Sequence, residues 1–368
     1  MKFNFIFKRY KKSQIIICDR NYNKINFHPF RSFFLDNKEI NLFYLLTVFK
    51  NYFFNKKCKT LKQAYLLTII NKVKAKIIID NLESFTGANL KKIAPHLKLI
   101  VSQNGIYFKQ TQNKINISLS LIRPDYCLVW AKNQSKIIKR NVQTIITGSI
   151  KNNEQIYFEK RNKIYDLMFI SEFRKIDDVI KKKQIIFNNF SDHIKNNYSY
   201  LNFTNVFISQ TLILLQNYCK QNKKKLSIAM ASSREDKKHK ISYNDEELFF
   251  KNLAPSCIIT NLNSEELANK SKLIICNTSN FGMEMIAKGH KVLFLNFNHD
   301  FFDIPFKMKN GPFWQKDFNE KETINKIKHL TLMSNQNYKK LMSKYFFHNY
   351  FDKNNIKLKK LIKNIIEK

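Results

Sequence analysis

The residues best suited to chemistry lie in the stretch 272–296, KLIICNTSNFGMEMIAKGHKVLFLN. An apolar run, the polar loop 277–280, a short helical pattern and a second apolar run predict strand, loop, helix and strand. At such a loop the first backbone N–H groups of the helix and the small hydroxyl groups point outward together. This arrangement binds anions, above all phosphate. The segment therefore indicates a nucleotide-sugar pocket.

Three residues of this segment need separate interpretation. Gly282 and Gly289 are two of only six glycines in the chain, so each marks a backbone that must turn or admit a close neighbour. We expect Gly289 to cap the end of the helix. Glu284 is predicted in the first helical turn, where a carboxylate complements the helix dipole and could also accept hydrogen bonds from sugar hydroxyls. The sequence leaves both roles of Glu284 open.

Further polar clusters follow other predicted strands. They are Asp80-Asn81, Gln103-Asn104-Gly105, Gly148-Ser149, Ser171 with Arg174, and Ser232-Ser233-Arg234. The carboxyl ends of parallel strands are where doubly wound folds bind their ligands, so joint placement there indicates a binding site. The alternative for each cluster is ordinary capping, because turns after strands are usually polar.

The two arginines in these clusters are unusual for this composition. Lysine supplies most of the 65 basic residues, and arginine occurs at only eight positions. An arginine retained among lysines indicates fork geometry, such as a bidentate grip on a diphosphate by Arg174 or Arg234. The alternative is a surface ion pair, for instance between Arg234 and Glu235.

The formal net charge of +37 attracts nucleic acid, anionic lipid or phosphorylated substrates. The abundance of lysine, asparagine and isoleucine is also typical of compositional drift in an AT-rich genome. No nucleic-acid recognition motif or arginine-rich segment is present, so we expect no specific nucleic-acid partner. The eight histidines are scattered, and no metal site or cofactor is predicted. The absence of P-loop, GxGxxG and GxSxG motifs argues against kinases, dehydrogenases and serine hydrolases.

The elements that must position these residues alternate along the chain. Predicted strands are 14–18, 76–80, 98–102, 126–130, 143–147, 166–170, 225–230, 256–260, 272–276 and 291–295. Predicted helices include 61–73, 134–140, 203–220, 245–253 and 264–269. Strands that are apolar on both faces and separated by helices predict parallel sheets covered by helices. The expected fold is α/β, with two doubly wound, Rossmann-like domains at 1–155 and 164–350 joined by the polar stretch 151–163.

The last residues, 351–368, are predicted as a separate amphipathic helix. Its apolar face either docks on the protein's own core or lies on a membrane surface. The six cysteines form no CxxC pair, and the longest apolar-rich stretch, 41–54, is too short to span a bilayer. We therefore expect a cytoplasmic protein, with peripheral contact to an anionic membrane as the extension of that prediction.

Taken in order, these clusters resemble the surface carbohydrate biosynthesis proteins of bacteria, which act in lipopolysaccharide and capsule synthesis and are related to GT-B glycosyltransferases. More distant relatives of that family are the CDP-glycerol glycerophosphotransferases and the UDP-GlcNAc 2-epimerases. The matching stretches are IIIDN at 77–81, KLIVSQNGIY at 98–107, DYCLVWAKNQSK at 125–136, ITGSIKNN at 146–153, LMFISEFR at 167–174 and SNFGMEMIAKGHKVLFLN at 279–296.

The resemblance implies a GT-B-like architecture in which an acceptor-side domain and a nucleotide-sugar domain face each other across a cleft. It places Ser279, Asn280 and Gly282 on the donor diphosphate and Glu284 on the ribose. It also places Ser171 and Arg234 on the donor side, and Asp80, Gln103, Asn104 and Ser149 on the acceptor side. Many retaining GT-B enzymes carry a second glutamate seven residues before the ribose-binding one. Here that position is Asn277.

The favoured function is a metal-independent glycosyltransferase that moves a sugar or related phosphate-linked unit from a nucleotide donor to a lipid-linked or oligosaccharide acceptor, a surface-glycan precursor. The leaving diphosphate would be stabilised by the helix N-terminus after Ser279 and by Arg234. Asp80 is the preferred general base, with Asp19 and Glu83 as alternatives. The rival functions are epimerisation or hydrolysis of a nucleotide sugar on the same fold, and binding of nucleic acid by the basic surface.

Overall fold

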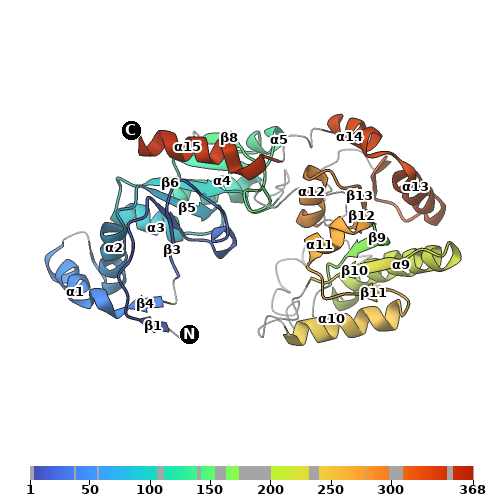
Figure 1. Ribbon diagram of the computed structural model, residues 1–368, viewed down its shortest axis with the longest axis horizontal. Helices are drawn as coiled ribbons and strands as arrows, with labels where there is room; N and C mark the ends of the chain where they lie inside the picture. Colours follow the sequence, from blue (N-terminus) through green and yellow to red (C-terminus); the bar gives the residue numbers. More distant parts are fainter. Residues whose placement is uncertain are drawn as a thin grey trace. The chain divides into compact units, whose positions relative to one another are not determined.

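The computed structural model describes residues 4–36, 39–55, 58–105, 112–138, 142–153, 163–173, 200–231, 240–277, 279–297, 310–345 and 351–367. The chain divides into two compact units (Figure 1). The first unit contains Met1–Ile156 together with Phe346–Lys368, and the second contains Tyr157–Tyr345. Each unit has its own sheet, so each is described by itself.

The first unit is built on a six-stranded parallel sheet with the order β3-β2-β5-β6-β7-β8. The strands are β2 (Ile15–Ile17), β3 (Ser32–Phe34), β5 (Ile77–Asn81), β6 (Lys98–Ser102), β7 (Tyr126–Val129) and β8 (Gln143–Ile146). The chain runs from β2 outward to β3 and then returns to the other side of β2 with β5. The direction of winding therefore changes between β2 and β5, where a doubly wound sheet opens a crevice.

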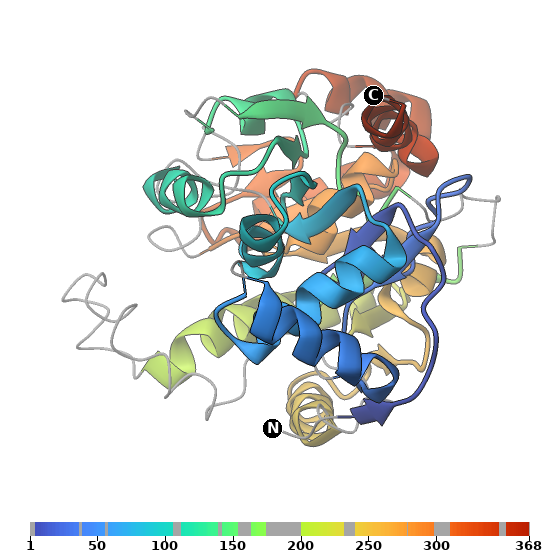
Figure 2. The ribbon, with the colours of Figure 1, turned by 90° about the vertical axis from the view of Figure 1, so that its left-hand side faces the viewer.

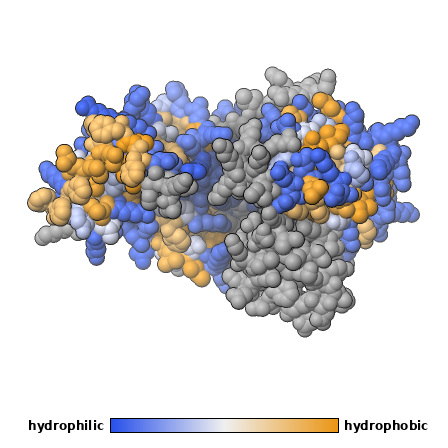
Figure 3. Space-filling model, turned by 90° about the horizontal axis from the view of Figure 1, so that it is seen from below, coloured by the Kyte–Doolittle hydropathy of each residue, from blue (hydrophilic) through white to orange (hydrophobic). Residues whose placement is uncertain are grey.

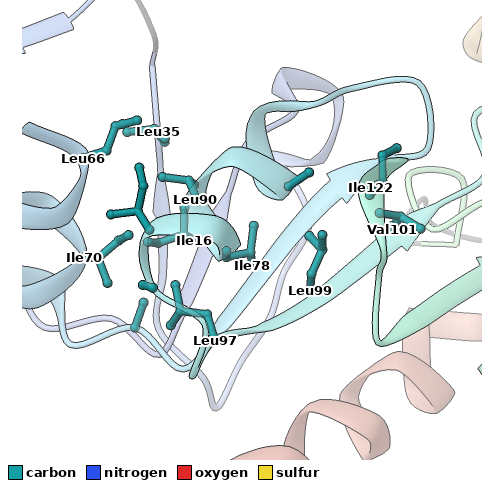
Figure 4. Packing of buried hydrophobic residues seen from close by; sticks show 14 of the residues in the cluster. Ile16, Leu35, Leu66, Ile70, Ile78, Leu90, Leu97, Leu99, Val101 and Ile122 are labelled. Atoms are coloured by element: carbon teal, nitrogen blue, oxygen red, sulfur yellow. The ribbon is translucent and has the colours of Figure 1, made fainter. Parts of the chain in front are cut away.

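Helices cover both faces of this sheet. They are α1 (Leu45–Phe54), α2 (Leu61–Val73), α3 (Thr86–Ile93), α4 (Gln112–Ile122), α5 (Lys132–Ser135) and α15 (Ile356–Ile366). Alternate strand residues such as Ile16, Ile78 and Leu99 pack with α2, α3 and α4, and Figure 4 shows part of this cluster. Both faces of the strands are buried, which explains why their sequences lack polar alternation.

A small parallel pair, β1 (Asn4–Ile6) and β4 (Glu39–Asn41), lies apart from the main sheet and leads into α1 through the 3-10 helix η2 (Leu42–Tyr44). Helices α1 and α2, drawn in blue, lie side by side in Figures 1 and 2. Asn51 of α1 donates a 2.8 Å hydrogen bond to Thr68 of α2, and Val48 is buried between the elements. Helix α1 is thus held to the unit along one face only.

The C-terminal helix α15 belongs to the first unit and is not a separate segment. Its residues Leu358 and Ile362 are fully buried against Ile15, Ile17 and the other side chains on the second face of the sheet. The predicted apolar face of this helix is therefore buried in the protein's own core. The chain returns to the first unit only after completing the second, and this explains why the linear division at 351 missed the association.

The second unit is built on a seven-stranded sheet with the order β11-β10-β9-β12-β13-β15-β14. The strands are β9 (Tyr165–Ile170), β10 (Leu226–Ala229), β11 (Ile258–Ile259), β12 (Ser271–Cys276), β13 (Val292–Leu295), β14 (Asn310–Gly311) and β15 (Trp314–Gln315). All pairs are parallel except β14 with β15. Winding proceeds from β9 to β10 and β11 and then returns to β12, so the switch point of this sheet lies between β9 and β12.

The helices of the second unit are α9 (Tyr200–Gln221), α10 (Lys240–Leu253), α11 (Ser264–Asn269), α12 (Asn280–Ala287), α13 (Glu320–Leu332) and α14 (Asn335–Ser343). Helix α11 begins at a capping box in which Asn263 and Glu266 bond each other's backbone N–H groups. Each of these helices is too short to cross a bilayer or not apolar enough to do so, within the part of the chain that the structure describes.

The predicted α/β fold of two Rossmann-like units is confirmed, and all ten predicted strands are present. The prediction of a helix at 134–140 is wrong beyond its first two residues. Helix α5 ends at Ser135 and residues 136–137 form a turn, while residues 139–140 lie outside the described part of the chain. Gln134, inside α5, accepts a buried hydrogen bond from Gln103.

Candidate functional site

The switch point of the second unit brings two of the predicted clusters together. Strands β9 and β12 are hydrogen-bonded neighbours, with Phe169 opposite Ile275. Ser171 and Asn277, which follow these strands, therefore leave the sheet at the same edge. The Ser171 hydroxyl accepts a 3.2 Å hydrogen bond from the N–H of Phe173, so it shapes the turn after β9. This edge is where an open parallel sheet binds its ligand.

Helix α12 begins directly beside this edge. Ser279 is its N-cap, and the Ser279 hydroxyl accepts a 3.2 Å hydrogen bond from the N–H of Phe281. Asn280 is the first helical residue, and its side chain is exposed. The first-turn N–H groups and the positive end of the helix dipole point away from the helix, which is the arrangement that binds phosphate.

Gly282 lies in the first turn of α12, on the side of the helix that faces the sheet. A Cβ atom at this position would lie 2.5 Å from the Cys276 sulfur and 3.2 Å from the Phe294 ring. Gly282 therefore allows α12 to pack closely on β12 and β13, as we expected from the scarcity of glycine in this chain. Gly289 has φ of +88° and ends the helix, as expected of a C-terminal cap.

Glu284 is the fifth residue of α12, so its predicted place in the first helical turn is wrong by one position. The side chain is buried, one helical turn before the buried Lys288. Lys288 forms an ion pair with Glu265 of α11, and the charge of Glu284 also lies close to it. Burial lowers the pKa of Lys288, and the two carboxylates act against this shift. Glu284 thus neutralises a buried lysine in addition to any ligand contact.

Two features of this edge were not identified from the sequence. The side-chain oxygen of Asn277, the first residue of the loop before α12, is buried and has no hydrogen-bond partner among the described residues. Glu172, directly after Ser171, places a carboxylate near the Cys276 thiol; burial raises the pKa of that thiol, and Glu172 raises it further. The position of Glu172 in the sequence could have indicated it, because Glu172 lies inside the stretch LMFISEFR, which includes most of β9 and the turn after it.

Arg174 and Arg234, the predicted diphosphate ligands, lie outside the described residues. The same holds for Ser232, Ser233 and Thr278. The roles assigned to these arginines remain predictions.

The acceptor-side cluster at the end of β5 has a structural role. Asp80 is only 1% exposed, and its two carboxylate oxygens accept hydrogen bonds from the N–H groups of Gly87 (2.8 Å) and Asn81 (2.9 Å). Burial raises the pKa of Asp80, and these N–H groups act against the shift. A general base must reach its substrate. The buried, hydrogen-bonded Asp80 is poorly placed for the catalytic role predicted from the sequence.

Asn81 joins Asp80 to the neighbouring strand. Its amide donates a 2.5 Å hydrogen bond to Asp19, which follows β2, and its oxygen accepts one from the N–H of Glu83. Asp19 in turn accepts a 2.8 Å hydrogen bond from the N–H of Asn21. The switch point of the first unit is therefore closed by its own side chains, while Glu83 is exposed beside it.

The cluster after β6 is also bonded internally. The Gln103 amide donates to the carbonyl of Gly105 (2.6 Å) and to the side-chain oxygen of Gln134 (2.5 Å). Its own side-chain oxygen accepts from the N–H of Trp130 at 2.9 Å, and the residue is 2% exposed. Gln103 thus ties the ends of β6 and β7 together. Asn104 is the half-exposed member of this cluster.

Gly148 and Ser149 connect β8 to the returning C-terminal segment. Gly148 has φ of +72° and forms an isolated β-bridge with Phe351. Ser149 is buried, and its carbonyl accepts hydrogen bonds from the N–H groups of Asn152 and Asn153. Asn153 then donates a 2.8 Å hydrogen bond to Asn355 at the start of α15. These residues secure the C-terminal helix.

A model of a protein family matches residues 101–366 of the chain, which is more than half of its 368 residues. The family is described as "putative O-antigen biosynthesis protein". The chain belongs to this family. No curated protein matches it in sequence.

Solved structures of other proteins have a fold similar to that of this chain. The wall teichoic acid polymerase TagF aligns with 98% of this chain and 90% of its own, at 13% identity and a TM-score of 0.53. S. aureus MnaA, solved with UDP, aligns over 97% of this chain and 96% of its own, at 14% identity and a TM-score of 0.51.

A third structure, described as a "putative UDP-N-acetylglucosamine 2-epimerase" from Listeria monocytogenes, aligns over 93% of this chain and 91% of its own. The identity is 10% and the TM-score 0.50. At such low identity these likenesses establish the fold, which is GT-B-like, and not the reaction. The family match identifies the chain as a surface-carbohydrate biosynthesis protein.

Across the described ranges, histidine, cysteine, aspartate and glutamate side chains do not form a cluster of three that could hold a metal ion. His290 is buried after α12, and burial keeps its pKa well below the usual value, with Lys163 and Lys288 adding to the shift.

Proposed function

We propose that this protein is a glycosyltransferase that binds a nucleotide-linked donor at the switch point of its second unit. It would transfer a sugar or related phosphate-linked unit to a cell-surface glycan precursor. The first-turn N–H groups of α12, with Ser279 and Asn280, would receive the diphosphate. Glu284 would accept hydrogen bonds from the ribose, and Arg174 and Arg234 would add charge.

The single observation that carries this proposal is the buried oxygen of Asn277 beside the N-terminus of α12, which has no partner among the described residues. A buried acceptor without a partner costs free energy, and a ligand that donates a hydrogen bond would recover it. The ribose hydroxyls and base amide of a nucleotide are such donors. Among the similar structures, MnaA was solved with UDP and TagF with CDPG, and this supports a nucleotide as the ligand class.

The test is a calorimetric titration with UDP-, GDP-, CDP- and CMP-linked sugars, on the native chain and on Ser279→Ala. Loss of the cap removes one first-turn contact, so we expect about tenfold weaker binding. Ser334→Ala is the matched control. Ser334 caps α14 in the same unit through a 3.1 Å hydrogen bond and has no role in the proposed site.

Both serine variants should lose similar stability, about 1 kcal/mol, because each removes an N-cap. Only Ser279→Ala should lose nucleotide affinity. Failure of all four donors to bind the native chain, or equal weakening by both variants, would refute the proposed site.

Epimerisation or hydrolysis of the nucleotide sugar is the second candidate, favoured by the likeness to the Listeria monocytogenes structure described as an epimerase. Both reactions need no acceptor. Product analysis with the donor alone separates them from transfer, because a transferase leaves the sugar unchanged until the acceptor is added.

A further inference from the structure

Helix α1 and the 3-10 helix η2 that leads into it carry a ridge of exposed apolar side chains on the first unit. Leu42, Leu46, Phe49 and Phe53 recur at helical spacing and are 38%, 87%, 44% and 71% exposed. We call these four residues the α1 ridge. Figure 3 shows apolar side chains gathered at the end of the first unit where α1 lies. Large apolar groups standing this far out in one contiguous group are typical of an interaction surface.

The ridge is extended by apolar side chains of neighbouring segments. Phe54 at the end of α1 is 83% exposed, and Phe7 after β1 is 74% exposed. The Phe7 ring contacts Phe43 edge-on, with 5.2 Å between the ring centroids, so the N-terminal strand continues the same apolar area. Two segments distant in sequence therefore present aromatic groups together.

The helix is anchored firmly enough to present this ridge. Val48 and the Asn51–Thr68 hydrogen bond fix the opposite side of α1 to α2. The ridge is thus the exposed side of a helix whose other side packs on α2. The C-terminal helix α15 differs, because Leu358 and Ile362 are already buried in the core.

The segments that carry and flank the ridge are basic, and the acidic Glu39 of the adjoining strand β4 is paired with Lys8 at 3.3 Å. Residues 1–12 contain Lys2, Lys8, Arg9, Lys11 and Lys12 and no acidic residue, and residues 42–63 contain Lys50, Lys56, Lys57, Lys59 and Lys62 and no acidic residue. Arg9 lies over the Phe43 ring at 5.2 Å, which places a cation beside the apolar area. Apolar groups flanked by lysines match the chemistry of an anionic bilayer surface, where the apolar groups enter the acyl region and the cations meet phosphate.

We propose that the α1 ridge docks the protein on an anionic lipid bilayer, with Leu46, Phe49 and Phe53 inserted at the boundary between the head groups and the acyl chains. A second copy of the chain is a poorer occupant, because two identical basic rims would repel each other across a shared interface. The proposal is independent of the donor site, since it uses only residues of the first unit.

Co-sedimentation tests the ridge with vesicles of phosphatidylglycerol mixed with phosphatidylcholine, and with phosphatidylcholine alone. We expect binding to the anionic vesicles that falls with added salt. The triple variant Leu46→Ser, Phe49→Ser, Phe53→Ser should lose binding at least about tenfold. The matched control Ile213→Ser, Leu248→Ser, Leu332→Ser removes three exposed apolar groups from the second unit and should bind as the native chain does.

The depth to which the ridge enters the bilayer is measured with the variant Phe53→Trp and vesicles of brominated lipid. The native Trp130 and Trp314 are each 1% exposed, so the added indole reports the change. Its emission should shift to shorter wavelength and be quenched, while Leu332→Trp on the second unit should do neither.

Equal binding of the ridge and control variants would overturn the proposal. So would absence of quenching at position 53. Failure of the native chain to bind anionic vesicles, with light scattering showing a dimer that the ridge variant separates, would assign the ridge to a second copy instead. Nucleotide titration of the ridge variant checks that it remains folded.

Discussion

The two units place polar residues at the same point of a doubly wound sheet, but they use them differently. In the first unit, Asp19, Asp80 and Asn81 bond to one another and to nearby N–H groups. In the second unit, the Asn277 oxygen has no partner among the described residues, and the first turn of α12 begins beside it. A satisfied cluster stabilises the fold, whereas an unsatisfied one costs stability and favours a ligand. This difference supports nucleotide binding at the second unit.

The largest expected effect comes from replacing one polar side chain by alanine at the strand ends of each sheet. Gln103→Ala leaves the Trp130 N–H and the Gln134 oxygen buried without the partner they now share, so we expect a loss of about 3 kcal/mol in the free energy of unfolding. Asn277→Ala removes an oxygen that has no partner among the described residues and should change stability by less than about 0.5 kcal/mol.

Urea unfolding measures both variants. Trp130 fluorescence reports the first unit and Trp314 the second, since these are the only tryptophans in the chain. A large loss in Asn277→Ala would erase the contrast between the two edges.

Close packing of α12 gives the next effect. Gly282→Ala places a Cβ atom against the Cys276 sulfur and the Phe294 ring and should cost about 2 kcal/mol. Adding Cys276→Ala removes the nearer obstacle, so the double variant should recover part of the loss.

Gly289→Ala serves as the control for this pair. It is strained by its φ of +88°, but no atom of the described residues lies within 4 Å of the new Cβ, so Cys276→Ala should not rescue it. If the stability losses of Gly282→Ala and Cys276→Ala simply add in the double variant, close packing of Gly282 on Cys276 is not the cause. Thermal unfolding followed by Trp314 is the measurement.

The attachment of α15 distinguishes the first unit further. Asn355 has φ of +53°, donates to the Ile150 carbonyl and accepts from Asn153, both at 2.8 Å. Asn355→Gly keeps this backbone conformation and loses both bonds, so we expect a loss of about 1.5 kcal/mol.

Hydrogen exchange should then accelerate in α15 while the second unit is unchanged. Asn354→Gly is the matched control, because Asn354 has φ of +54° and is exposed. Equal exchange in the two variants would show that the Asn153–Asn355 pair is dispensable.

The smallest effect concerns a feature that the units share. Asp125 precedes β7 and Asp166 lies in β9; burial raises the pKa of each, but hydrogen bonds and ion pairs with Lys91 and with Lys272 prevail and lower it. A lowered pKa in the folded state gives stability that is complete above the ordinary carboxyl pKa. That stability is lost as the pH falls through the folded value.

Each pair should contribute about 1 kcal/mol at neutral pH. Asp125→Asn should reduce the loss of stability at acid pH that Trp130 reports, and leave that reported by Trp314 unchanged. Asp166→Asn should have the opposite pattern. A pH profile unchanged by either variant would remove these carboxylates from the acid response.

Prediction from sequence succeeded where local pattern dominates. Buried strands such as β6 and the periodic helix α2 were predicted with the bounds that the structure has, because apolar runs and helical spacing are local signals. Helices α1, α3, α4, α13 and α14 were not predicted. Helix α1 reads as an apolar stretch without a clear polar face, and its two sides are distinguished only by packing on α2.

The candidate site was predicted by position and only partly by role. The sequence identified the strand ends, and the structure shows that Ser171 and Ser279 flank one edge of the sheet. It could not reveal that Asn81 and Gln103 are bonded to side chains within the fold, because Asp19 is 62 residues from Asn81 and Gln134 is 31 residues from Gln103.

The sequence by itself determined the α/β class, ten of the strands and the N-cap of α12 at Ser279, since each depends on residues near one another in the chain. Only the tertiary structure decided which polar groups are bonded within the fold, which apolar helix face is buried and which is exposed. These properties depend on long-range contacts. They separate Asn277 from Gln103, and the α1 ridge from α15.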